Sequence, residues 1–189
     1  MQDTINLVKI AAEQKGLQFK INLADNIPGK LYGDAGRIRQ VLINILNNAI
    51  KFTKEGYIRL DVTGQYVASD VINLKLVVED TGIGIKKEDL TAIFESFRQL
   101  DMNRNRQCEG TGLGLAITKQ LITLMDGDIQ VESEYGKGTV FSFDLKQVVV
   151  DETPMGAFED KIRDIKSEEY TYNETFIVPD AHVLLVDDN

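Results

Sequence analysis

The chain has 189 residues, 43% of them hydrophobic, and can therefore bury a core of its own. Its single cysteine, Cys108, excludes an internal disulfide framework, and no apolar run approaches the roughly 20 residues of a membrane-spanning helix. The net charge of −9 is uneven, since residues 147–189 carry 11 acidic and 3 basic side chains while residues 1–146 are close to neutral, so there is no basic stripe for nucleic acid.

The first part of the chain alternates between helical and strand patterns. Apolar residues at helical spacing predict a helix over 4–15. Strict alternation of apolar and polar residues predicts a half-buried strand over 17–23. After a predicted Pro-Gly turn at 28–29, residues 34–53 form the longest helical pattern, with Asp34 as its expected N-cap.

This long helix carries two different stripes. Its apolar stripe consists of Ile38, Val41, Leu42, Ile45 and Ala49. Asn44, Asn48 and Lys51 follow one another at i, i+4 and i+7 and form a polar stripe. Two amides and an ammonium group suit a magnesium ion that keeps most of its ligands as water and phosphate oxygen. The alternative is an ordinary solvated helix face.

The rest of the chain continues the mixture of helices and strands. The expected elements are strands at 57–63 and 71–79, a short helix at 87–94, a helix ending at about residue 125, and a hairpin of strands at 128–134 and 138–145. We therefore predict an α+β fold, a two-layer α/β sandwich with a mixed, mostly antiparallel sheet and helices on one face. A doubly wound parallel sheet fits less well because of the terminal hairpin.

Asp80 stands where an apolar strand meets the glycine-rich turn EDTGIGI. A partly buried carboxylate needs a hydrogen-bond donor, and the amino group of an adenine would serve. Gly82 and Gly84 are expected to let the backbone approach a flat base, because they have no Cβ. The alternative is a strand-to-helix turn capped by an aspartate.

A second glycine-rich segment precedes a predicted helix and consists of Gly110, Thr111, Gly112, Leu113, Gly114 and Leu115. Backbone amides of such a segment form an anion site for phosphates, although no Gly-Lys-Ser/Thr sequence closes it as in the common phosphate loop. A hinge with a helix cap is the alternative. The aperiodic stretch 95–109 has the length of a functional loop and could fold over a triphosphate through Arg98, Gln99, Arg104 and Arg106.

Five motifs in one order resemble the catalytic, ATP-binding domain of the sensor histidine kinases. They are NNAIKFT, EDTGIGI, IFESFRQ, GTGLGLAI and GKGTVFSF, and the resemblance covers about residues 17–146. It implies a fold in which a mixed sheet and a helical layer sandwich ATP. It also implies a protein-histidine kinase that transfers the γ-phosphate of ATP to a histidine on a dimerisation domain absent from this chain.

The resemblance further implies roles for single residues. Asn48 would coordinate Mg²⁺, and Lys51 and Gln99 would contact phosphate, so these three form the expected catalytic set. Asp80 would fix the adenine amino group, and Thr139 would lie near the adenine. The full expected cofactor-binding set is Asn44, Asn48, Lys51, Phe52, Asp80, Gly82, Gly84, Ile85, Gly110, Thr111, Gly112, Leu113, Gly114, Leu115 and Thr139.

The residue type at the position of Asn44 distinguishes kinases from hydrolases of the fold that the resemblance implies. Gyrase- and chaperone-type ATPases of the same fold carry a glutamate one turn before the magnesium asparagine, where it activates water. Asn44 occupies that position, and an amide cannot act as a general base. Transfer to another side chain is therefore favoured. The alternatives are an ATPase of the same fold and a nucleotide-binding regulatory module without phosphotransfer.

The only histidine, His182, precedes an apolar strand pattern instead of lying on a helix, so we do not expect it to accept phosphate. The expected organisation is the end of a preceding helix at 1–16, the catalytic domain at 17–146, an acidic linker at 147–180 and a truncated start of a receiver domain at 181–189, where AHVLLVDDN resembles a receiver's first strand. This suggests a hybrid kinase.

The expected partners follow from this organisation. They are the dimerisation and phosphoacceptor helices of the same parent protein, and a receiver domain or response regulator. Since there is no signal-peptide pattern, we expect a cytoplasmic location, with no nucleic-acid or membrane contact by this chain. Membrane anchoring of a longer parent stays open.

Overall fold

The computed structural model describes residues 2–95 and 112–154. The helices in these ranges are α1 (Gln2–Gln14), α2 (Ala35–Phe52) and α3 (Gly114–Thr123). The strands are β1 (Gln18–Leu23), β2 (Pro28–Tyr32), β3 (Tyr57–Ala68), β4 (Val71–Asp80), β5 (Asp128–Glu134) and β6 (Gly138–Pro154). All of them belong to one structural unit, Met1–Gly156.

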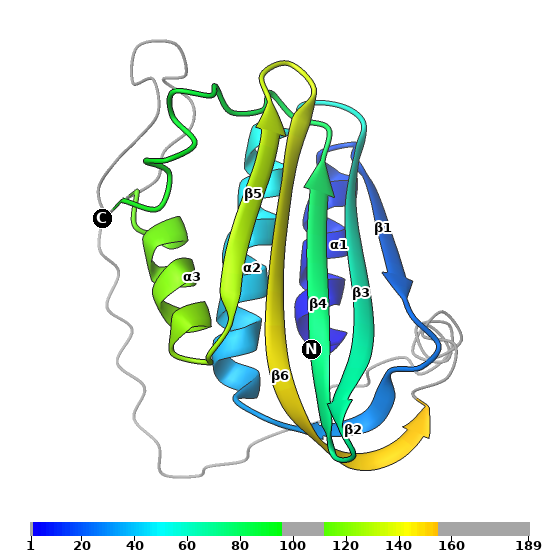
Figure 1. The fold of residues 1–189 in the computed structure, drawn as a ribbon. Helices are drawn as coiled ribbons and strands as arrows, with labels where there is room; N and C mark the ends of the chain where they lie inside the picture. The colour runs from blue at the N-terminus through cyan, green and yellow to red at the C-terminus, as the bar shows by residue number, and fades with distance from the viewer. Residues whose placement is uncertain (1, 96–111, 155–189) are drawn as a thin grey trace, which may run out of the picture. The chain divides into compact units, whose positions relative to one another are not determined.

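The strands form one mixed sheet (Figure 1). Its order is β1-β3-β4-β6-β2, and β5 also pairs with β6. Only β1 and β3 run parallel, while the other described pairs are antiparallel. Val148 of β6 pairs with Val71 on one side and with Tyr32 on the other, so β2 continues the sheet edge that β5 begins.

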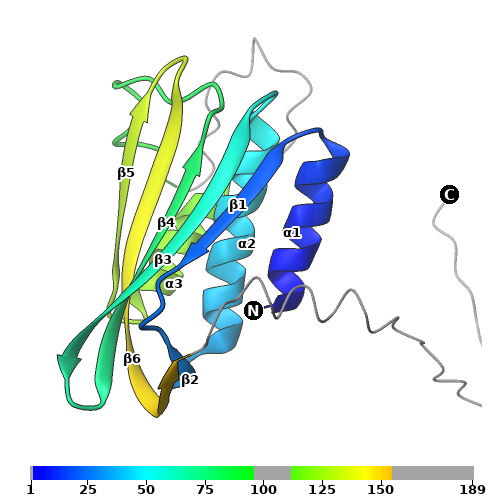
Figure 2. The ribbon, with the colours of Figure 1, turned by 90° about the vertical axis from the view of Figure 1, so that its right-hand side faces the viewer.

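The three helices cover one face of this sheet, and α2 lies between α1 and α3 (Figure 2). The predicted apolar stripe of α2 is buried, together with Leu46. The sheet meets it with inward-facing residues at every second position of its strands. These inward-facing residues include Ile58, Leu60, Leu76, Phe141 and Phe143. The predicted α+β two-layer sandwich is confirmed.

Local capping explains where α2 begins and how its end is held. The Asp34 side chain accepts a hydrogen bond from the Arg37 backbone N–H at 2.9 Å, which confirms the predicted N-cap. At the other end, Lys15 Nζ donates to the carbonyl oxygens of Ile50 at 2.5 Å and Lys51 at 3.0 Å. A cation at the C-terminus of a helix also interacts favourably with the helix dipole.

The first helix is part of the core. Ile5, Val8 and Ala12 of α1 are buried, and the last two belong to the same apolar cluster as α2. Leu7 and Ile10 on its other face are exposed. That α1 continues a longer preceding helix stays a prediction. None of the helices in the described ranges is long and apolar enough to span a membrane.

The structure differs from the predicted elements in three places. The short helix predicted over 87–94 is wrong, because this stretch consists of successive turns with hydrogen bonds such as Ala92 N–H to Asp89 O at 3.0 Å. Its hydrogen bonds join residues three apart, as in tight turns, and a stretch this short gains few α-helical hydrogen bonds against the cost of nucleation. Strand β2 stands where only a turn was predicted. Strand β6 runs to Pro154, beyond its predicted end at 145 and into the segment assigned to the linker.

Candidate functional site

The polar stripe of α2 faces the beginning of α3. Asn44 Nδ2 donates to the Gly114 carbonyl oxygen and to Thr118 Oγ1, each at 3.3 Å. Asn44 Oδ1 accepts a hydrogen bond from Gln40 Nε2 at 3.2 Å. The Asn44 amide therefore joins α2 to the glycine-rich segment, and no carboxylate occupies its place.

Asn48 and Lys51 continue the stripe toward the end of α2, and both side chains are half-buried. Lys51 Nζ lies 5.0 Å from the centroid of the Phe52 ring. The ring of Phe52 is 36% exposed, so a flat apolar surface stands beside an ammonium group and an amide. This combination can hold a ligand that is aromatic at one end and anionic at the other.

Asp80 is the last residue of β4 and lies opposite Thr139 of β6. It is only 7% exposed, and its Oδ1 accepts a hydrogen bond from the Gly82 backbone N–H at 2.8 Å. Burial raises the pKa of the Asp80 carboxyl above its usual value, while hydrogen bonds from the Gly82 and Thr139 backbones oppose this rise. Asp80 is thus a buried acceptor with part of its hydrogen-bonding capacity filled.

Gly82 and Gly84 are both required by close packing of the turn that follows β4. A Cβ at Gly82 would lie 2.5 Å from the Phe52 carbonyl oxygen. Gly84 has a φ of +66°, and a Cβ there would lie 2.1 Å from the Glu134 carbonyl oxygen. The space that a Cβ would take at both glycines is filled by protein backbone, and the close approach of this backbone to a flat base stays a prediction. They allow the turn to pack on α2 and on the β5–β6 hairpin.

Ser133 of β5 links two of the predicted site residues and was not predicted itself. Its Oγ accepts a hydrogen bond from the Ile85 N–H at 2.7 Å and lies 3.0 Å from Thr139 Oγ1. The same hydroxyl bonds to the Gly138 carbonyl oxygen at 2.8 Å. Strand alternation carried a signal for it, because Ser133 falls on the same face as the buried Ile129.

The glycine-rich segment is described from Gly112 onward. Gly112 has a φ of +71°, and Leu113 precedes the first residue of α3 without a side-chain cap. A Cβ at Gly114 would meet no atom within 4 Å. The uncapped N-terminus of α3 leaves backbone amides for an anion. Several predicted residues lie outside the described ranges: Arg98, Gln99, Arg104, Arg106, Cys108, Gly110, Thr111 and His182.

Backbone contacts bring these pieces together. The Ile83 N–H donates to the Phe52 carbonyl oxygen at 3.2 Å, and the Gly136 N–H donates to the Ile83 carbonyl oxygen at 2.7 Å. The end of α2, the turn after β4 and the β5–β6 hairpin therefore meet, while Asn44 joins the start of α3. The arrangement offers a buried carboxylate beside the turn that packs on the last turn of α2, and amides with an ammonium group along α2.

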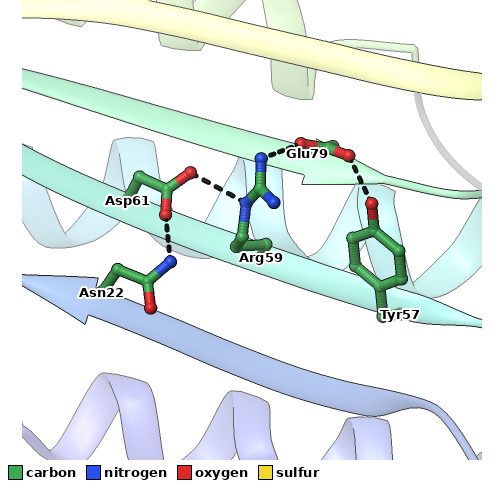
Figure 3. Close-up of polar contacts among 5 residues, drawn as sticks. All are labelled: Asn22, Tyr57, Arg59, Asp61 and Glu79. Atoms are coloured by element: carbon green, nitrogen blue, oxygen red, sulfur yellow. Dashed lines mark hydrogen bonds and ion pairs between the residues drawn. The ribbon is translucent and has the colours of Figure 1, made fainter.

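A second polar cluster lies on the opposite face of the sheet (Figure 3). It contains Asn22, Tyr57, Arg59, Asp61 and Glu79. Asn22 Nδ2 donates to Asp61 Oδ1 at 2.6 Å, the Tyr57 hydroxyl donates to Glu79 Oε1 at 2.5 Å, and Arg59 pairs with both carboxylates. These groups satisfy one another across β1, β3 and β4, which is typical of a structural network on a sheet face.

The chain is similar to known proteins in both its sequence and its fold. A family model described as "Histidine kinase-, DNA gyrase B-, and HSP90-like ATPase" matches residues 33–149. The chain is 43% identical over 145 residues to "Hybrid signal transduction histidine kinase B" of Dictyostelium discoideum, an overlap of 77% of this chain and 7% of the relative. It is 34% identical over 158 residues to "Signal transduction histidine-protein kinase BarA" of Escherichia coli K12, covering 82% and 17%.

Solved structures show the same fold. The full-length ShkA structure in complex with AMPPNP aligns with a TM-score of 0.65 at 30% identity, covering 79% of this chain and 30% of that one. A mycobacterial sensor histidine kinase, MprB, aligns with a TM-score of 0.57 at 23% identity, covering 78% and 94%. The chain spans less than a fifth of the length of the two curated relatives named above.

Proposed function

The chain belongs to the family of histidine kinase-, DNA gyrase B-, and HSP90-like ATPases and carries their ATP-binding catalytic domain, and from this premise we propose that it transfers the γ-phosphate of ATP to a histidine. The acceptor would lie on dimerisation helices outside this chain. The observation that carries the proposal is that α2, which bears the polar stripe, contacts both the turn after Asp80 and the start of α3.

The adenine end of the site would be formed by Asp80. Its buried carboxylate can accept a hydrogen bond from the exocyclic amino group of adenine, which guanine lacks at that position. Phe52 would lie against the base or the ribose, and Thr139 and Ile85 would line the same end through their shared contact with Ser133. Adenine selectivity would follow from this buried acceptor.

The phosphate end would be formed by α2 and the start of α3. Asn48 offers an amide oxygen to Mg²⁺, Lys51 offers a positive charge, and the backbone of Gly112 to Leu115 offers N–H groups. Within residues 2–95 and 112–154, no group of three or more His, Cys, Asp or Glu residues could hold a metal ion. The donor set fits an ion that takes its other ligands from phosphate and water, which is the preference of Mg²⁺. Gly110, Thr111 and Gln99 stay proposed phosphate contacts outside the described residues.

The chemistry would then be positioning with charge neutralisation. Bound Mg²⁺ supplies neutralisation of charge on the phosphoryl oxygens. Lys51 would hold the γ-phosphate, and Asn48 would fix the orientation of the triphosphate, so that the phosphorus faces the incoming imidazole in line with the leaving oxygen. The nucleophile comes from the acceptor helix.

Asn44 favours transfer over hydrolysis. It occupies the place where a general base for water would be needed, and its amide is already hydrogen-bonded to Gln40, Gly114 and Thr118. An ATPase is the second candidate function only because the same family includes such enzymes. A regulatory module without transfer would not need Asn48 and Lys51 in this arrangement.

The wider organisation is also proposed from the relatives. One relative is named a hybrid histidine kinase, which agrees with the acceptor helices and the receiver domain expected beside this domain. The proposed limits stay 1–16 for the preceding helix and 181–189 for the start of a receiver. Because β6 runs to Pro154, the proposed catalytic domain extends to that residue instead of ending at 146, and the linker follows it up to 180.

Calorimetric titration with ATP and GTP in the presence of Mg²⁺ tests the binding step. The wild-type chain should bind ATP more tightly than GTP, and Asp80→Asn should lose this preference because an amide can present a donor to the adenine amino group. Equal preference for ATP in both proteins would contradict the role of Asp80.

A further inference from the structure

The hydroxyl group of Thr53 has no role in the site described so far. Thr53 is the C-cap of α2, and its backbone N–H donates to the Ala49 carbonyl oxygen at 3.1 Å. Its side chain is 0% exposed, and Oγ1 is the one buried side-chain polar atom in the described part of the chain without a hydrogen-bond partner. The other buried threonine hydroxyls near the site, those of Thr118 and Thr139, are both within hydrogen-bonding distance of a partner.

Thr53 lies where α2 meets the end of β4. The Ile83 N–H donates to the Phe52 carbonyl oxygen, and Gly82 approaches the same oxygen closely, so the turn after Asp80 rests directly on the last turn of α2. Within this junction, the Thr53 hydroxyl is close enough to Asp80 to lower the pKa of its carboxyl. No hydrogen bond of ordinary length and angle joins the two groups.

The Asp80 carboxyl can take a further donor. An ionised carboxylate accepts about four hydrogen bonds. The described donors to Asp80 are the backbone amides of Gly82 and Thr139. Burial and the neighbouring charge of Glu79 both raise the pKa of the Asp80 carboxyl, so the ionised form is held against two opposing effects.

We propose that Thr53 is a positioning residue for Asp80, whose hydroxyl donates to one carboxylate oxygen and directs the other toward the amino group of an adenine. The inference rests on the proposed function, in which Asp80 reads the base. A buried hydroxyl without a partner does not help the fold, and such groups call for a separate reason. Pairing with the Asp80 carboxylate, across the junction of α2 and β4, supplies that reason.

Two substitutions separate the hydroxyl from the shape of the side chain. Thr53→Val keeps the branched shape and removes the hydroxyl, whereas Thr53→Ser keeps the hydroxyl. In the nucleotide-free chain, carbon-detected NMR of the Asp80 carboxyl should show a higher pKa in Thr53→Val than in the wild type. ATP affinity measured by calorimetry should fall about 10-fold, as expected for one hydrogen bond to a charged group. Thr53→Ser should restore both values, and the midpoint of thermal unfolding of Thr53→Val should not fall.

Three results would overturn the proposal. One is an unchanged Asp80 pKa together with unchanged ATP affinity in Thr53→Val. Another is weaker ATP binding with an unchanged pKa, since the hydroxyl would then act on the base itself. The third is a marked fall in the unfolding midpoint, which would give Thr53 a structural role. If the wild-type chain bound no ATP, the proposed function would fail, while the NMR titration would still decide whether Thr53 acts on Asp80.

Discussion

At the residue scale, the buried carboxyl of Asp80 lowers the stability of the fold, and its proposed role is to bind adenine. Its carboxyl is buried, and the resulting rise in pKa means that the folded chain favours the protonated form more than the unfolded chain does. Such a group stabilises the fold at pH values below its unfolded pKa, and this contribution is lost as the pH rises through the folded pKa. An ionised Asp80 is therefore a destabilising group, and the proposed mode of ATP binding would require it.

Asp80→Asn should accordingly raise the midpoint of thermal unfolding at pH 7. The difference from the wild type should shrink as the pH falls through the raised pKa of Asp80, because the wild-type carboxyl then becomes neutral too. Thermal unfolding followed by circular dichroism between pH 7 and the acidic range measures this. Asp151→Asn is the control, because hydrogen bonding to Thr153 lowers the pKa of Asp151. This substitution should therefore lower the unfolding midpoint at pH 7 instead of raising it. A constant difference at every pH would speak against an ionised, buried Asp80.

Wild-type ATP affinity has its own pH dependence. Since the adenine amino group needs an ionised acceptor, affinity should fall on acidification, and the fall should begin at a higher pH than for an ordinary aspartate. Calorimetric titrations over a pH series check this. Affinity that stays level through the pH range where the Asp80 carboxyl protonates would contradict the assigned role.

Asn48→Ala should abolish phosphotransfer. Loss of the proposed metal ligand is expected to reduce transfer about 100-fold or more. Asn47→Ala is a matched control, because Asn47 is the neighbouring asparagine on the exposed side of α2. Transfer of label from ATP to an acceptor-helix fragment measures both variants. Unimpaired transfer by Asn48→Ala would contradict the assignment of the polar stripe to magnesium and phosphate binding.

At the scale of the elements, glycine residues allow the turn after β4 to pack closely on its neighbours. Gly84 combines a positive φ with backbone of β5 where a Cβ would stand, so Gly84→Ala is expected to destabilise the chain by at least about 2 kcal/mol. Gly114→Ala, at an open position in the first turn of α3, should instead stabilise by up to about 1 kcal/mol. Urea unfolding of the two variants gives the comparison, and equal effects would refute this reading of the turn.

The elements also show what could and could not be predicted from the sequence. The two stripes of α2, its N-cap and strand β5 follow from local periodicity and were predicted closely. Strand β2 could not be predicted from the sequence, because its residues indicate a turn and form a strand only by pairing with the far end of β6. The extension of β6 beyond residue 145 was not predicted either, because the acidic residues near its end indicated a linker.

The residues of the candidate site also divide into those that could be predicted from the sequence and those that could not. Spacing on one helix was enough to bring Asn44, Asn48 and Lys51 onto one face. The role of Ser133 depends on a turn and a hairpin that come together only in the folded sheet. The burial of Thr53 beside Asp80 likewise depends on how α2 and β4 meet.

At the scale of the whole molecule, α2 is both the core helix and the carrier of the polar stripe. Leu42, on its buried face, is 0% exposed, whereas Leu7 of α1 is 67% exposed. Leu42→Ala should therefore lower the free energy of unfolding by about 2–5 kcal/mol, and Leu7→Ala by no more than about 0.5 kcal/mol. Urea unfolding measures both. Similar losses in the two variants would contradict the packing of α2 under the sheet.

The most direct test of the central claim uses ATP labelled on the γ-phosphate, with Mg²⁺ and an added acceptor-helix fragment of a histidine kinase. Label on the protein and free phosphate are followed together. We expect acid-labile, base-stable label on the added fragment, because the chain would supply the nucleotide site and the fragment would supply the histidine. Release of free phosphate by the chain alone, with no label on the fragment, would contradict this expectation and would show that Asn44 does not prevent hydrolysis.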